Sequence, residues 1–198
     1  RRQRQMCIRD RVRRWEFVLG KFSGLVLLLV VTYAVMTVLF VPLTWLGMYT
    51  HFFDYRNVSP EYLEAFWQDY AWQTADQLSR GFLLSLLHTV TMAAVAVVVC
   101  VRLPMVLGVV VYFGVFVAGH LVQGVVRLVQ GAGRVMVTVV EAVALAVPNL
   151  ETFNVAHEVG LGQYIAWSDI SACVGYTVVY SAAAVIVAVV LFRRREVF

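Results

Sequence analysis

The chain has 198 residues, of which 61% are hydrophobic and only 14% are charged, and its mean hydropathy is +0.78. A soluble domain of this length carries about 25% charged residues, so this composition excludes an ordinary soluble enzyme or binding module. The net charge of +4 does not indicate nucleic-acid binding, because eight of the 16 basic residues lie within 1–21 and three more lie at 193–195. Basic residues that flank apolar segments are typical of a membrane protein.

Four long segments without a charged residue predict the membrane spans. Each contains the roughly 20 apolar residues that a helix needs to cross a bilayer. We place the spans at about 22–48, 81–101, 105–122 and 170–192. The expected fold class is therefore all-α, a polytopic membrane helix bundle with about four transmembrane helices.

The segments between the spans predict structure at the membrane surface. Residues 12–21 are amphipathic and are expected to lie in the interface before the first span. Segments 54–80 and 123–169 are expected on the outer face, and a helix that begins near Ser59 is expected in the first of them. Within the second, 135–147 is apolar but too short to span, which predicts one arm of a re-entrant or interfacial helical hairpin.

The positions of the arginines predict the topology. If 135–147 crossed the membrane, Arg193 to Arg195 would lie outside, against the positive-inside rule. With four spans, both visible ends of the chain are cytoplasmic, which predicts a multi-pass protein of the cell membrane, inner or plasma. The sequence begins with Arg1 rather than Met, so we expect a preceding part. Residues 1–11 are interpreted as a solvated basic arm or as a non-native remnant, and we favour the remnant; 12–198 is the transmembrane domain.

The sequence contains no motif for catalysis. The serines and threonines lack a GxSxG or SxxK context, which nucleophilic enzymes use. Gly20 and Lys21 resemble the end of a phosphate-binding loop, but the first glycine of such a loop is missing and a span follows at once. We therefore expect no enzymatic activity and no bound cofactor on this chain.

The histidines are the remaining candidates for polar chemistry. The four histidines fall in four different segments and none has a partner at metal-ligand spacing, and the three cysteines form no CxxC pair, so we expect no metal site. His88 and His120 lie in or near spans, where an ionisable side chain marks a transport pathway or an interhelical polar contact. We favour neutral histidines that hydrogen-bond between helices. Glu141 either lines a cavity or faces the outer interface, and we favour the interface.

Four motifs, in order along the chain, resemble those of ABC-2-type transporter permeases. Residues 13–22 (RRWEFVLGKF), followed by Gly24, resemble the cytoplasmic stretch SR-x-EF-x-x-GK-x-x-G, which leads into the third helix of that family. Residues 115–121 (VFVAGHL) look like the end of its fifth helix, and 148–154 (PNLETFN) look like its PNL-x-x-F outer segment. Residues 192–198 (FRRREVF) look like its F-x-RRE-x-F terminus.

The resemblance implies that the chain is the C-terminal part of a permease subunit of an ATP-driven exporter. Two permeases, identical or different, would pair with two ABC ATPase subunits that bind ATP and Mg²⁺. The resemblance also implies that the cytoplasmic stretch couples the permease to the ATPase. The residues concerned are Arg13, Arg14, Glu16, Phe17, Gly20 and Lys21.

Two alternatives remain at this point. The residues of the cytoplasmic stretch could instead serve only as a membrane anchor and topology signal. The chain could be a membrane-embedded accessory or scaffold protein without transport activity. The absence of a charged residue from the middle of a long span keeps this second alternative open, because ion-coupled carriers usually need one. The apolar side chains of the spans do not indicate which substrate would be transported.

Overall fold

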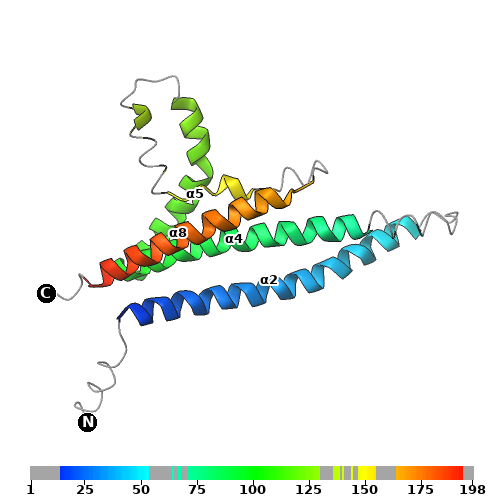
Figure 1. The fold of residues 1–198 in the computed structure, drawn as a ribbon, viewed down its shortest axis with the longest axis horizontal. Helices are drawn as coiled ribbons and strands as arrows, with labels where there is room; N and C mark the ends of the chain where they lie inside the picture. The colour runs from blue at the N-terminus through cyan, green and yellow to red at the C-terminus, as the bar shows by residue number, and fades with distance from the viewer. Residues whose placement is uncertain are drawn as a thin grey trace, which may run out of the picture.

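The regular structure of the chain is helical throughout the part that its structure describes. That structure is a computed structural model, and it describes residues 14–53, 64, 67, 71–129, 136–138, 140, 144, 147–154 and 164–193. Four long α-helices and one 3₁₀ helix account for most of them (Figure 1). They are α2 (Arg14–Phe53), α4 (Trp72–Arg102), α5 (Met105–Val129), η2 (Glu151–Phe153) and α8 (Trp167–Arg193).

The prediction of an all-α membrane bundle is confirmed. Each of the four α-helices is long and apolar enough to cross a membrane. Many large apolar side chains on α2 and α5 are exposed, as they must be when lipid rather than water surrounds a helix. The protein is therefore a multi-pass membrane protein, with four candidate spans within its described residues.

The first helix is longer than the sequence predicts. We expected 12–21 to lie in the interface as a separate amphipathic segment, but residues 14–21 are the first turns of the 40-residue helix α2. Val18 is only 3% exposed and packs beside Val185 and Ala188 of α8. Val18 thus fixes this segment against α8, whereas Trp15, Phe17 and Leu19 stay exposed.

The other three helices also extend beyond their predicted spans. Residues 72–80 belong to α4, residues 123–129 belong to α5, and α8 begins at Trp167. We ended the spans at the first charged or polar residues, but the backbone hydrogen bonds of a helix can continue into the headgroup region and water. The helix expected near Ser59 lies outside the described residues, as does most of 135–147, of which 136–138, 140 and 144 are helical.

Helices α2, α4 and α8 lie side by side along the long axis of the molecule (Figure 1). The start of α2 meets the end of α8, so residues 14 and 193 lie at the same end of the bundle. Small side chains allow α4 and α8 to approach closely. Ala94 and Ala188 are fully buried. The hydroxyl oxygens of Thr91 and Thr177 lie 3.4 Å apart.

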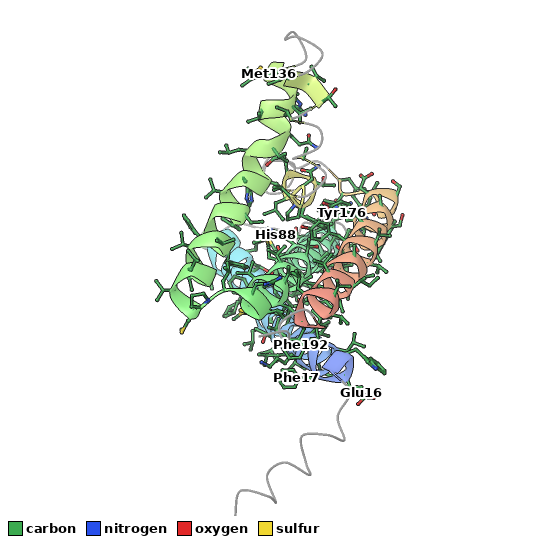
Figure 2. All side chains as sticks on the ribbon, turned by 90° about the vertical axis from the view of Figure 1, so that its left-hand side faces the viewer. Glu16, Phe17, His88, Met136, Tyr176 and Phe192 are labelled. Atoms are coloured by element: carbon green, nitrogen blue, oxygen red, sulfur yellow. The ribbon has the colours of Figure 1, made fainter. Side chains whose placement is uncertain are left out.

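Helix α5 leaves the other three at a steep angle (Figures 1 and 2). Pro104 ends α4, because proline has no N–H to continue the ladder, and its carbonyl accepts the Gly108 N–H at 2.8 Å in the first turn of α5. Residues 147–154 then return to α5, where the Leu150 N–H donates to the Gly119 carbonyl at 3.1 Å. We call residues 147–154 the return segment.

Candidate functional site

The histidines of two different spans lie together. The ring centroids of His88 on α4 and His120 on α5 are 5.6 Å apart, with an angle of 77° between the ring planes. His88 also stacks on Phe116 of α5 at 6.1 Å and on Phe153 of η2 at 5.9 Å. Figure 2 shows His88 and Tyr176 between α5 and α8. We call His88, Phe116, His120, Phe153 and Tyr176 the histidine cluster.

The return segment is fixed to two helices beside the histidine cluster. The Asn149 N–H donates to the Tyr176 hydroxyl of α8 at 2.8 Å, and the rings of Phe153 and Tyr176 are 5.9 Å apart. On the other side, Leu150 and Pro148 pack on Gly119 of α5 so closely that a Cβ at Gly119 would lie 2.7 Å from either. The return segment therefore connects α5 to α8.

Hydrogen bonding in the histidine cluster differs from what we expected. His120 Nδ1 lies 3.0 Å from the Phe116 carbonyl oxygen of its own helix, and Nδ1 carries the proton because a carbonyl can only accept. His88 Nε2 and Asn149 Oδ1 are buried and have no hydrogen-bond partner within the described residues. The two histidines thus join the helices by ring contacts, and the cluster keeps one unused polar atom on α4 and one on the return segment.

A metal centre is not formed by the residues that the structure describes. They contain no group of three or more His, Cys, Asp or Glu side chains that could hold an ion. A pair of imidazoles alone supplies too few ligands for the tetrahedral sites that zinc prefers. Glu141, the third polar candidate from the sequence, lies outside the described residues.

The predicted coupling residues form one end of the bundle. Phe17 stacks on Phe192 of α8 with centroids 6.3 Å apart, and Lys21 Nζ lies 4.6 Å above the Phe17 ring. Glu16, Gly20 and Lys21 are exposed. Arg14 is the first residue of α2, and Arg13 lies outside the described residues. Figure 2 shows Glu16, Phe17 and Phe192 near one another. At this end of the bundle, an aromatic contact between two helices thus lies beside exposed charged side chains.

Arg80 is a buried charged residue that the sequence analysis did not single out. It is 4% exposed, its Nη2 lies 2.7 Å from an Asp76 carboxylate oxygen, and its Nη1 donates to the Ile165 carbonyl. Its guanidinium carbon also lies 4.4 Å from the ring centroid of Tyr164 and 4.6 Å from that of Trp167. In the sequence, only the spacing of four residues between Asp76 and Arg80 indicates an ion pair, and such spacing is common on exposed helices.

Comparison with known proteins adds no assignment to these sites. No protein-family model matches the chain, and no curated protein or solved structure matches it.

Proposed function

We propose that this chain is the C-terminal part of the membrane-spanning permease subunit of an ATP-driven, ABC-2-type exporter. It would work in the cell membrane, paired with a second permease and with ABC ATPase subunits that bind ATP and Mg²⁺. Both visible ends of the chain would face the cytoplasm. The four apolar helices support a role inside the membrane, and the resemblance of four motifs supports the family.

The observation that carries the proposal is that these motifs meet in pairs. The Phe17 ring of the first motif stacks on Phe192 of the last, although the two residues are 175 positions apart in the chain. The Gly119 carbonyl of the second motif accepts the Leu150 N–H of the third. Chance matches in an apolar sequence would have no reason to form contacts with one another, so the pairing favours a common structural role.

The first pair suggests how the ATPase would act on the permease. Residues 14–21 and the part of the span before Pro42 form one continuous helix, so a push on Glu16 or Lys21 moves this part of α2 as a rigid body rather than bending a joint. The contact of Phe17 with Phe192 passes the same displacement to α8. Packed helices transmit such shifts because the side chains between them are closely packed and cannot deform gradually. A displaced helix therefore moves its neighbour.

The test begins with the partner. The tagged chain, purified from its native membrane in a mild detergent, should bring down a chain that contains GxxxxGK[ST], as identified by mass spectrometry. Glu16→Lys combined with Arg14→Glu should leave insertion intact but abolish this association, because it inverts the charge pattern that the partner reads. Glu64→Lys, which changes an exposed carboxylate on the connection between α2 and α4, is the matched control and should bind normally.

Two outcomes would count against the proposal in different ways. If the folded double variant keeps its ATPase, residues 14–21 are only an anchor and the coupling assignment is wrong. If no chain with a phosphate-binding loop associates with the unaltered protein, the accessory or scaffold function replaces the exporter.

A further inference from the structure

A groove lies between α2 and α4, towards the end where α8 begins. Its volume is about 340 Å³, within the range of small-molecule sites in proteins. The walls are apolar, with Val30 and Ala34 from α2 and Phe82 and Leu86 from α4. A groove on the membrane-spanning part of a bundle opens to the bilayer, so its natural occupant is a lipid chain rather than a dissolved metabolite.

One end of this groove is polar. Ser79, Arg80 and Trp167 line it, at the level where α8 begins. Tryptophans gather at the headgroup level of a bilayer, and Trp45 contacts Trp72 nearby with ring centroids 5.6 Å apart. The apolar walls thus lie towards the hydrocarbon core and the polar end lies where lipid headgroups are found.

The polar end retains hydrogen-bonding capacity. Arg80 has five N–H donors, of which one on Nη1 serves the Ile165 carbonyl and one on Nη2 serves Asp76. Its Nε is buried with no partner within the described residues. Arg80 lines the groove, and a fixed guanidinium with donors to spare is suited to a phosphate oxygen.

The charges at this end select the kind of headgroup. Arg80 is paired with Asp76, so the site carries one positive and one negative charge, and the Asp76 side chain is 43% exposed. A zwitterionic headgroup would place its phosphate on Arg80 and its ammonium group on Asp76. An anionic headgroup without an ammonium group would instead face the Asp76 carboxylate, and like charges at a contact are costly.

We propose that the groove between α2 and α4 is a binding site for a zwitterionic phospholipid, with an acyl chain along Ala34 and Phe82 and the headgroup at Arg80 and Asp76. The bound lipid fills space between α2 and the rest of the bundle. This site does not depend on the proposed exporter function, because a scaffold protein with the same groove would bind the same lipid.

The experiment measures lipid binding to the full chain by native mass spectrometry after removal of co-purified lipid. Phosphatidylethanolamine and phosphatidylglycerol with the same acyl chains are added in turn. The first should bind about fivefold more tightly, the effect of about one interfacial charge. Asp76→Asn removes the carboxylate and should reverse this preference towards phosphatidylglycerol.

A second pair of variants tests the groove itself. Ala34→Trp fills the groove from its exposed α2 wall and should abolish tight lipid binding. Val38→Trp adds a tryptophan one turn later, at a side chain that is 70% exposed and outside the groove, and should bind as the unaltered chain does. Thermal unfolding of each variant in detergent checks its fold. If Ala34→Trp does not fold, the proposal is tested by the Asp76→Asn variant alone, through its change of lipid preference.

The proposal is overturned by equal binding of the two lipids to the unaltered chain or by stronger binding of phosphatidylglycerol. It is overturned equally by an Asp76→Asn variant with unchanged preference, or by a folded Ala34→Trp variant that binds as tightly as Val38→Trp.

Discussion

Gly119 is the residue whose size decides whether the return segment can reach α5. Its carbonyl accepts the Leu150 N–H, and the Pro148 carbonyl oxygen would lie 2.7 Å from a Cβ at this position. That neighbour is backbone and cannot rotate away as the end of a side chain can. At the scale of single residues, the absence of a methyl group is thus what allows α5 and the return segment to touch.

We expect Gly119→Ala to lower the free energy of unfolding by about 1–3 kcal/mol, as overpacking of a close contact does. Gly114→Ala is the matched control, since Gly114 lies on the same helix with no atom near its added methyl group. There alanine should leave stability unchanged or raise it by about 1 kcal/mol through helix propensity. Thermal unfolding in detergent measures both, and equal effects would mean that the close contact is absent from the folded protein.

Arg80 holds the segment before α8 against α4 through several weak contacts at once. We expect Arg80→Ala to destabilise the protein by about 1–3 kcal/mol, because the buried Ile165 carbonyl loses its donor. Arg102→Ala is the control, because Arg102 is an exposed arginine in the last turn of the same helix. Chemical unfolding in mixed micelles should show little change for this control, and a similar loss in both variants would argue against a special role for Arg80.

At the scale of the helices, α2 is attached to the bundle at separated points along its length. Phe17 contacts Phe192, the Tyr33 hydroxyl lies 2.8 Å from the Thr89 hydroxyl oxygen, and the Trp45 indole N–H donates to the Ala71 carbonyl at 3.1 Å. Most of the surface of α2 between these points is exposed. Between Phe17 and Tyr33, which lie before Pro42, a helix fixed in this way holds its register only while its backbone hydrogen bonds are continuous.

Ser23→Pro tests this continuity. Proline inside the helix removes one backbone hydrogen bond and introduces a kink, at a local cost of about 3 kcal/mol. We expect the span to insert normally but the contact between residues 17 and 192 to loosen. A short thiol crosslinker between Phe17→Cys and Phe192→Cys should react less in the Ser23→Pro background than in Ser23→Ala. Equal crosslinking in the two backgrounds would show that residues 14–22 are held by α8 and not by the helix.

At the scale of the whole molecule, the arrangement of the helices places both ends of the described chain on one side. Cysteine labelling determines which side that is, in a background without Cys7, Cys100 and Cys173. Glu64→Cys should react with an impermeant thiol reagent in intact cells, whereas Glu16→Cys should react only after permeabilisation, because the basic clusters lie beside residue 16. The opposite labelling would invert the proposed topology, and labelling of both in intact cells would exclude a four-span arrangement.

The number of spans could be predicted from the sequence because length and apolar composition are local properties. Each of the predicted spans lies within one long helix. The helix ends could not be predicted in the same way. Charged residues mark where a helix enters water or headgroups, and residues 14–21 and 72–80 show that the helical backbone continues through that boundary.

The contacts between helices depend on information that apolar sequence does not carry. The pairing of His88 with His120 is set by the rotation of α4 and α5 about their axes, and spans that are apolar on all sides leave this rotation undetermined. The burial of Arg80 requires Ile165, which is 85 residues away along the chain. A charge at the end of a span is usually solvated, and the Asp76–Arg80 spacing of four residues is common on exposed helices, so the sequence near Arg80 did not predict its burial.

The length of α2 has a consequence for how this helix crosses the membrane. The part that we place in the membrane, 22–48, contains 27 residues, which makes it about 40 Å long at a rise of 1.5 Å per residue. Residues 14–21 carry Glu16 and Lys21 and reach the headgroups or water, so they add nothing to the length that must fit the hydrocarbon core. An upright segment of this length exceeds a hydrocarbon core of about 30 Å, whereas a tilt of about 40° reduces its projection to about 31 Å. Helix α2 should therefore cross the bilayer strongly tilted, and shortening 22–48 by one turn should lower this tilt.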